Sequence, residues 1–144
     1  MKRLLLLGTL LWLLVACGSS GSSGPSEKNL KSQMLSTWSA FQSGDYAKLY
    51  SYVSDDVRSH CTLDQFKAQT QLVRGSVGDN FLKSRLFIDN VQIQGTRASY
   101  ESTYSLNGAI LSVTSRYVHW ERDHWVPDQD PTSAPNPNFP CNPF

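Results

Sequence analysis

The chain has 144 residues, of which 40% are hydrophobic, with 13 basic and 12 acidic side chains. This length predicts one domain, and the apolar content is enough for a folded core, which excludes a chain that is disordered throughout. Because the charges are balanced and form no basic patch, we expect no nucleic acid partner.

The first residues have the pattern of an export signal. Lys2 and Arg3 precede an apolar run over residues 4–15 that is short for a membrane span. The run ends in the letters LVAC, which resemble the bacterial lipobox. In that class of signals the Cys thiol is acylated and a peptidase cleaves just before the Cys. The resemblance implies that residues 1–16 are a lipoprotein signal peptide and that acylated Cys17 anchors the protein.

Such an anchor implies an extracytoplasmic location, on the outer face of the plasma membrane or, in a bacterium with two membranes, in the periplasm or outer membrane. The alternative is an ordinary signal peptide cut elsewhere, with Cys17 as a spare thiol. Residues 17–26 continue as a Gly/Ser-rich run that has nothing to bury. We interpret this run as a flexible tether between the membrane and the domain.

Two amphipathic patterns joined by Gly44 and Asp45 predict a corner between two helices. Gly44 suits a helix end with positive φ, and Asp45 suits the N-cap of the next helix. We expect the first helix over residues 27–42 and the second over about residues 46–53. The apolar face of the first helix is expected to contain five residues: Leu30, Met34, Leu35, Trp38 and Phe41.

A third helix is predicted after Thr62. Thr62 and Gln65 have the spacing of a capping box, and we expect the helix to continue to about Val73 with Leu63 and Phe66 inward. Residues 75–79 are expected to form a loop.

From residue 81 onward the apolar period changes to two, which predicts strands over residues 86–93, 98–106 and 109–120. Asn107-Gly108 is typical of a two-residue hairpin turn, and a second tight turn at Arg122-Asp123 would place Trp120 opposite Trp125. The first turn sets a register that begins with Leu106 opposite Ala109. An uninterrupted ladder from there gives this inward face: Ala98, Tyr100, Tyr104, Leu106, Leu111, Val113 and Tyr117.

The same register places Glu101 and Arg116 on the outward face, where we expect a surface ion pair. The first strand is expected to have a kink or a bulge at Asp89-Asn90. Residues 127–144 contain six prolines and no periodicity. This proline-rich tail is expected to pack on the domain without joining a central strand.

Three Cys residues are present. If Cys17 is acylated, Cys61 and Cys141 remain as an even pair in an exported protein, where disulfides persist. The sequence therefore predicts a Cys61–Cys141 disulfide that pins the tail to the loop before the third helix.

Two motifs have a family resemblance. The pattern W-x-x-F-x-x-G-D-Y-x-x-L-Y runs from Trp38 to Tyr50, and W-x-x-x-x-W runs from Trp120 to Trp125. Together with the order of helices and strands, these resemble the nuclear transport factor 2-like superfamily over residues 27–126. The resemblance implies an α+β, cystatin-like fold: a cone of three N-terminal helices packed on a curved antiparallel sheet.

Members of that superfamily include SnoaL-like polyketide cyclases, ketosteroid isomerases and many non-enzymatic binding domains. The resemblance implies a pocket between the helices and the concave sheet face. Carried over to this chain, the lining would come from nine residues: Trp38, Tyr46, Tyr50, Phe66, Phe87, Tyr100, Tyr104, Val113 and Tyr117.

An isomerase of this kind needs a carboxylate base in the pocket and a hydroxyl group that stabilises an enolate. Tyrosines are available, but no inward strand position clearly carries an acid. Asp89 is the candidate base, because a bulge can reverse its direction. Asp55 and Asp56 are interpreted as a solvated helix end or turn, since adjacent side chains do not face each other on a helix.

The histidines, His60, His119 and His124, have no metal-ligand spacing, and we expect no metal and no cofactor. His119 and His124 are expected to point to opposite faces of the second hairpin. The sequence therefore favours a non-catalytic, membrane-anchored lipoprotein whose domain binds a small apolar ligand or a protein partner. Two alternatives stay open: a SnoaL-like or ketosteroid-isomerase-like enzyme, and an accessory subunit that dimerises through the outer sheet face.

Overall fold

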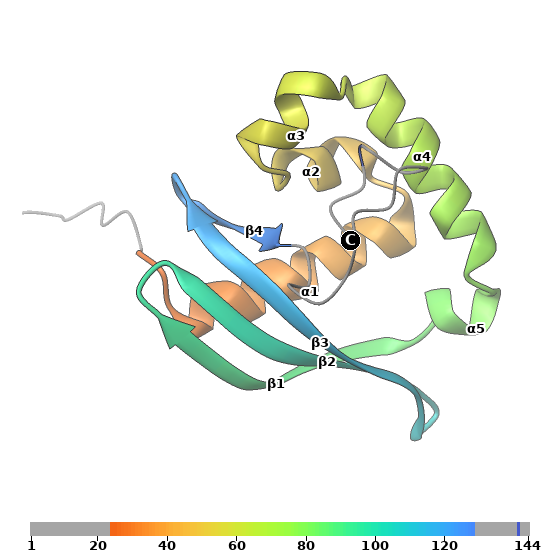
Figure 1. The fold of residues 1–144 in the computed structure, drawn as a ribbon. Helices are drawn as coiled ribbons and strands as arrows, with labels where there is room; N and C mark the ends of the chain where they lie inside the picture. Colours follow the sequence, from red (N-terminus) through yellow and green to blue (C-terminus); the bar gives the residue numbers. More distant parts are fainter. Residues whose placement is uncertain (1–23, 129–140, 142–144) are drawn as a thin grey trace, which may run out of the picture.

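The computed structural model describes residues 24–128 and Cys141, and within them the chain forms helices followed by one sheet (Figure 1). The helices are α1 (Glu27–Ser43), α2 (Tyr46–Ser51), α3 (Asp55–His60), α4 (Leu63–Ser76) and α5 (Asp79–Leu82). The strands are β1 (Arg85–Gln94), β2 (Arg97–Leu106), β3 (Ala109–Glu121) and β4 (His124–Asp128). The predicted signal peptide, Cys17 and most of the tether and tail lie outside the described residues.

The corner between α1 and α2 has the predicted caps. Gly44 adopts φ 74° after α1, and the Asp45 side chain accepts a hydrogen bond from the backbone N–H of Lys48 at 3.1 Å. α1 ends one residue later than expected, whereas α2 ends two residues earlier. One position of the predicted apolar face is wrong: Leu35 is 47% exposed.

α3 was missed by pattern reading. The Ser54 side chain caps it by accepting a hydrogen bond from the backbone N–H of Val57 at 3.1 Å. Asp55 and Asp56 are exposed, as expected, but they form the first turn of this helix, where negative charge is favourable to the helix dipole.

α4 has the predicted capping box between Thr62 and Gln65. It continues through Gly75 to Ser76, past the expected end, and a turn of α5 follows, so the predicted loop over residues 75–79 is mostly helical. Phe66 is buried as expected, but Leu63 is 39% exposed. The capping box thus predicted the start of α4 correctly, whereas the helix extends beyond its expected end at about Val73.

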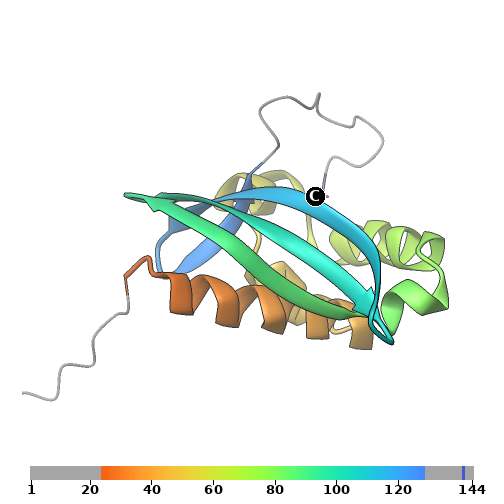
Figure 2. The same cartoon turned by 90° about the horizontal axis from the view of Figure 1, so that it is seen from below.

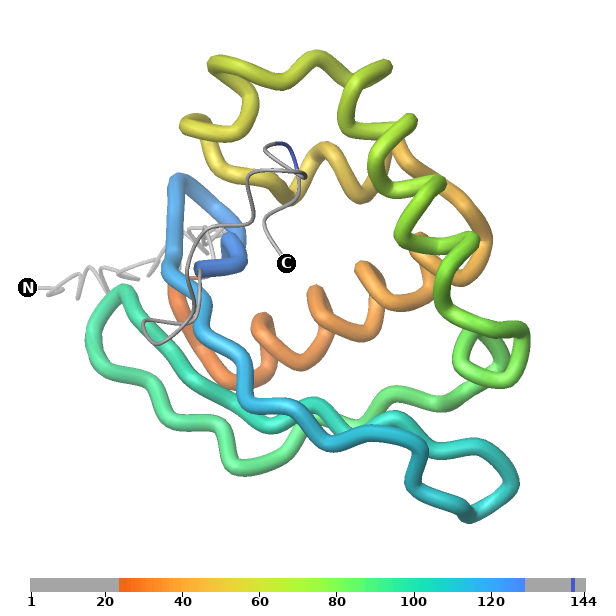
Figure 3. The backbone as a smooth tube through the Cα atoms, turned by 45° about the vertical axis from the view of Figure 1, so that its right-hand side comes forward, coloured from red at the N-terminus to blue at the C-terminus, as the bar shows by residue number. Residues whose placement is uncertain are grey.

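The sheet is antiparallel with the strand order β1-β2-β3-β4. Figure 2 shows β1, β2 and β3 curving over α1, and Figure 3 shows that α1 runs between these strands and the layer of α2 and α4. The architecture is therefore α+β, with helices packed on the inner face of an open, curved sheet. β4 reaches Asp128, so Pro127, where the tail was expected to begin, lies opposite Val118 at the end of an edge strand.

A β-bulge in the first hairpin changes the predicted register. Leu106 pairs with Ala109 and Ser105 with Ile110, but Tyr104 pairs with Ser112, which leaves Leu111 as an extra residue. A slip of one residue moves every later side chain to the other face. The inner face of β3 therefore carries Ser112, Thr114, Arg116 and Val118, and the predicted inward positions of β3 were wrong.

Most of the buried apolar side chains fall in two clusters. One lies between α1 and the sheet, and its members are Leu30, Met34, Ile88, Ala98, Tyr100, Val118 and Trp125. The other lies among α1, α2 and α4, and its members are Ala40, Leu49, Val53, Val57, Cys61, Phe66 and Cys141. The sulfurs of Cys61 and Cys141 are bonded, with Cα atoms 5.6 Å apart, in agreement with the pairing expected from the sequence.

Candidate functional site

The nine aromatic and apolar residues expected to line one pocket fall in three separate places. The first is the inner face of the sheet, where a packed group lies at the C-terminal end of α1. The Trp38 ring lies 4.8 Å from the Tyr104 ring and 5.4 Å from the Phe81 ring, between centroids. The indole N–H of Trp38 also donates to the backbone oxygen of Ser84 at 3.1 Å. The rings of Trp38, Phe81 and Tyr104 therefore contact one another.

Tyr100 lies deeper on the inner face, in the cluster under α1. Its side chain is 8% exposed, and its hydroxyl donates to the sulfur of Met34 at 2.9 Å. Burial raises the pKa of the Tyr100 hydroxyl well above its usual value of 10.0. Tyr100 is thus a neutral, hydrogen-bonded member of the core.

The second place is the helical layer. Tyr46 packs against the helical cluster, and the Tyr50 ring lies 5.4 Å from the ring of Phe66. The Tyr50 hydroxyl donates to the backbone oxygen of Cys61 at 2.5 Å, next to the disulfide. These aromatic residues stabilise the attachment of α2 to α4.

The third place is the outer face of the sheet, which carries Phe87, Val113 and Tyr117. Phe87 is opposite Thr103, and Thr103 is opposite Val113, so the three side chains form one row across β1, β2 and β3. Phe87 is 47% exposed and Val113 is 54% exposed. The bulge at Leu111 explains why Val113 and Tyr117 are not on the inner face.

Asp89 is also on the outer face. It lies opposite Glu101, and its side chain is exposed. The predicted ion pair between Glu101 and Arg116 is wrong, because Arg116 lies opposite Tyr100 on the inner face. The carboxylate of Glu101 instead accepts a hydrogen bond from the side-chain amide of Asn90.

The outer face therefore combines exposed apolar side chains with charged side chains in the rows on either side of them. Arg85 lies one row to one side of Phe87, and the carboxylates of Asp89 and Glu101 lie one row to the other side. Ile110, at the hairpin end, is 67% exposed. A row of exposed apolar groups flanked by opposite charges is typical of a surface that contacts another protein.

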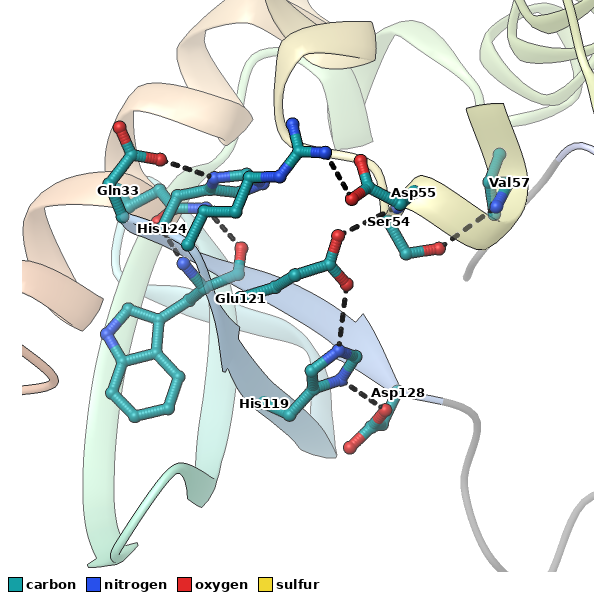
Figure 4. Close-up of polar contacts among 11 residues, drawn as sticks. Gln33, Ser54, Asp55, Val57, His119, Glu121, His124 and Asp128 are labelled. Atoms are coloured by element: carbon teal, nitrogen blue, oxygen red, sulfur yellow. Dashed lines mark hydrogen bonds and ion pairs between the residues drawn. The ribbon is translucent and has the colours of Figure 1, made fainter. Parts of the chain in front are cut away.

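A polar network at the β3–β4 hairpin was not predicted from the sequence (Figure 4). His119 lies between two carboxylates, with Nδ1 2.7 Å from an Asp128 oxygen and Nε2 3.3 Å from a Glu121 oxygen. The other oxygen of Glu121 accepts the backbone N–H of Asp55 at 2.8 Å. Arg122 reaches the Asp55 carboxylate at 2.5 Å. The network joins the hairpin to the first turn of α3.

His119 and His124 are on one face of this hairpin, contrary to the expectation that they point apart. Glu121 lies opposite His124 in the ladder, and Glu121 and His119 are two residues apart on the same strand. Trp120 is opposite Trp125 as predicted, with the rings 5.3 Å apart.

The charges of the network favour ionised acids. Burial raises the pKa of Glu121, but the N–H of Asp55 and the neighbouring His119 outweigh it, so the pKa is lowered from its ordinary value of 4.5. The hydrogen bond with His124 lowers the pKa of Asp123. Both shifts favour the ionised carboxylates of Glu121 and Asp123, and the contacts of Glu121 and Arg122 with Asp55 fix the hairpin against α3.

Within the described residues, no group of three His, Cys, Asp or Glu side chains is arranged to hold a metal ion. None of the helices in the described part of the chain is long and apolar enough to cross a membrane. No protein-family model matches this chain, and no curated protein matches it either. Function is therefore inferred from the fold and from the placement of side chains.

Proposed function

We propose that this protein is a membrane-anchored, extracytoplasmic lipoprotein with a nuclear transport factor 2-like domain that binds a protein partner without catalysis. The lipid anchor on Cys17 and the location rest on the lipobox pattern. The family rests on the two motifs and on the α+β fold with a curved sheet. The mode of action rests on the outer-face row Phe87–Thr103–Val113, in which Phe87 and Val113 are exposed, and this is the single observation that carries the proposal.

The aromatic residues support a protein partner over a small apolar ligand. Trp38, Tyr50 and Tyr100 are occupied by contacts with neighbouring rings, a sulfur and backbone oxygens. Phe87 and Val113 leave about half of their surface in water. Burying exposed apolar area contributes roughly 25 cal/mol per Å², so this row is the place where association gains most.

A second copy of the chain is the partner that the charges favour. A two-fold axis along the row, perpendicular to the strands, places Phe87 on Phe87 and Val113 on Val113 of the two copies. The same axis places Arg85 of each copy over Asp89 of the other. A self-complementary patch of this kind gives an isologous dimer. An axis parallel to the strands through β2 would instead oppose Glu101 to Glu101, which is unfavourable.

The test is the oligomeric state of the full-length, acylated protein in detergent, measured by light scattering that separates the protein and detergent masses. We expect a dimer for the natural chain and a monomer for Val113→Asp. Leu72→Asp is the matched control, because Leu72 is 67% exposed but lies on α4. A natural chain that is monomeric at all concentrations would contradict the proposal.

Charge reversal tests the orientation of the two copies. In Arg85→Glu alone, the new carboxylate faces Asp89 and Glu101 of the other copy. Three acids then meet at each end of the interface, and the dimer should weaken. Arg85→Glu combined with Asp89→Arg restores opposite charges across the two-fold axis and should restore the dimer. If the double variant is as weak as the single variant, the two copies do not meet in this orientation.

The isomerase alternative loses its base in this structure. Asp89 is exposed on the outer face, whereas Tyr100 and Tyr104 are buried on the inner face. A carboxylate must lie within hydrogen-bond reach of the proton it removes. We therefore do not extend the proposal to that chemistry.

A further inference from the structure

A groove of about 250 Å³ lies on the helical side of the sheet, where the first half of α1 passes the β3–β4 hairpin and the end of α2. It is separate from the outer sheet face and from the packed rings around Trp38. One wall is a face of α1 that carries Asn29, Ser32, Gln33 and Ser36. These positions have the spacing i, i+3, i+4 and i+7, so a polar stripe of α1 faces the groove.

The other wall combines two aromatic rings with polar groups. Tyr52 follows α2, Trp120 lies near the end of β3, and Asp123 and His124 come from the turn and the start of β4. Asp123 is 83% exposed at its side chain, and one of its oxygens lies 3.0 Å from Nδ1 of His124. The groove therefore has two aromatic side chains, hydroxyls and one carboxylate in its lining, while the Gln33 carboxamide is bonded to Trp125 and the side-chain amide of Asn29 to Gly24.

We propose that this groove binds a neutral saccharide of one or two rings. An aromatic ring offers an apolar face to the C–H groups of a sugar, while the hydroxyl groups of Ser32 and Ser36 and the carboxylate of Asp123 pair with its O–H groups. An apolar ligand would cover Ser32, Ser36 and Asp123 without hydrogen bonds, which is costly. An anionic ligand would meet the carboxylate of Asp123, and no Lys or Arg is among the described residues that line the groove.

The α1 wall of the groove is held in place by the fold. The side-chain oxygen of Gln33 accepts the backbone N–H of Trp125 at 2.7 Å, and its side-chain nitrogen donates to the backbone oxygen of Trp125 at 2.5 Å. These bonds link α1 to β4 and set the width of the groove before a ligand arrives. A site that is already formed loses less conformational freedom on binding.

The size of the groove limits the ligand. Its volume is slightly below the roughly 300–1,000 Å³ that is typical of sites for drug-sized molecules. A monosaccharide or a disaccharide that extends into solvent suits this volume. With few enclosed contacts, we expect dissociation constants on the order of millimolar.

The test is a titration of the full-length, ¹⁵N-labelled protein with cellobiose, maltose and N,N′-diacetylchitobiose, followed through the indole N–H signals. The protein is held in dodecylphosphocholine micelles, since glycoside detergents would compete. At least one disaccharide should shift the Trp120 indole signal, while the Trp38 signal, bonded to Ser84, stays in place. If none shifts the Trp120 signal at concentrations on the order of 10 mM, the proposal is overturned.

Two variants locate the binding. Ser36→Leu fills the groove without removing a core side chain and should weaken saccharide binding at least tenfold. Ser39→Leu is the matched control, because Ser39 is exposed on α1 and does not line the groove, and its binding should be unchanged. Equal affinity in Ser36→Leu and the natural chain would place the saccharide elsewhere.

Cyclohexanol tests the class of ligand, since it has a similar ring and one hydroxyl group. We expect its binding to be at least tenfold weaker than that of the best disaccharide. If cyclohexanol shifts the Trp120 signal with equal affinity, the groove is an apolar site and the saccharide proposal is overturned.

Discussion

Gln33 and Trp125 are 92 residues apart, and a ring of two hydrogen bonds joins them: the carboxamide of Gln33 pairs with both the N–H and the C=O of Trp125. β4 is an edge strand, so these backbone groups have no neighbouring strand. Unpaired edge groups are open to pairing with other chains. One side chain of α1 thus completes the edge of the sheet and positions α1 on it.

Replacing Gln33 should therefore destabilise the fold more than replacing a half-buried polar residue on a helix usually does. In Gln33→Ala, the N–H and C=O of Trp125 lose their partners, and we expect the free energy of unfolding to fall by about 2 kcal/mol. Chemical denaturation measures this change. Ser32→Ala, the exposed neighbour on α1, should change stability by less than about 0.5 kcal/mol. Equal effects of the two changes would show that the ring contributes nothing.

The disulfide should contribute strongly to stability. Cys61 and Cys141 are separated by 80 residues, and closing a long loop reduces the entropy of the unfolded chain. We expect Cys61→Ala with Cys141→Ala to lower the free energy of unfolding by about 2–4 kcal/mol. Gln69→Ala is a useful comparison, since the Gln69 oxygen accepts the Cys141 N–H at 3.1 Å, and it should cost about 1 kcal/mol.

Reductant tests the bond in the natural chain. Reduction should lower the midpoint of unfolding and add the mass of two hydrogens. An unchanged mass and an unchanged midpoint would show that the two thiols are free in solution.

Features of the fold that depend on a few neighbouring residues could be predicted from the sequence. Gly44, Asp45 and the capping box at Thr62 each act within one helical turn, and all three were found where expected. α3 has a comparable signal in Ser54 followed by two acids, which pattern reading undervalued because its apolar face is short. Local caps are readable because their partners are close in sequence.

The bulge at Leu111 has no such local signal. Its position depends on how β2 and β3 twist over α1, and an uninterrupted ladder from Asn107-Gly108 is equally compatible with the pattern of residues. One extra residue then moved Val113 and Tyr117 to the outer face, and with them much of the predicted pocket lining. The error arose from a single step in register and affected the site more than the fold.

The hairpin network was only partly open to prediction. His119 and Glu121 are two residues apart on a strand, so their shared face could have been expected. The contact between Glu121 and the N–H of Asp55 spans 66 residues and depends on where α3 packs. Sequence patterns contain no information on such a contact.

Glu121 should make stability depend on acid pH. Its pKa in the folded chain lies below the ordinary value of 4.5, so its contribution is present above that pH and is lost as the pH falls through the lowered pKa. Glu121→Gln removes this contribution. We expect the variant to be less stable than the natural chain near neutral pH, and this difference should shrink on acidification.

Urea unfolding of both proteins from about pH 6 to about pH 3 measures the difference. His119, His124 and Asp128 are present in both proteins, so the comparison between variants isolates the Glu121 carboxylate. A difference in stability that stays constant over the whole range would contradict the assignment.

Deleting Leu111 is the sharpest test of the register. Leu111 is 43% exposed and is the residue that β3 has in excess between Ile110 and Ser112. Its removal turns the bulge into an uninterrupted ladder and leaves Tyr104 opposite Ser112. Because later residues keep their faces, we expect a change in stability within about 1 kcal/mol.

Deleting Ser115 is the matched control. Ser115 is also exposed on β3, but it lies opposite Glu101 within the uninterrupted part of the ladder. Its removal shifts the following residues by one position, which turns Val118, now 1% exposed, toward the outer face. Exposing a buried Val and disturbing its neighbours should cost about 3 kcal/mol or prevent folding.

Chemical denaturation compares the two deletions, and near-ultraviolet circular dichroism reports whether the Trp120–Trp125 pair keeps its packing. The expected result is a folded protein without Leu111 and a strongly destabilised or unfolded protein without Ser115. Equal losses would mean that Leu111 is part of the ladder, in which case Val113 returns to the inner face and the outer row Phe87–Thr103–Val113 no longer exists as a binding surface.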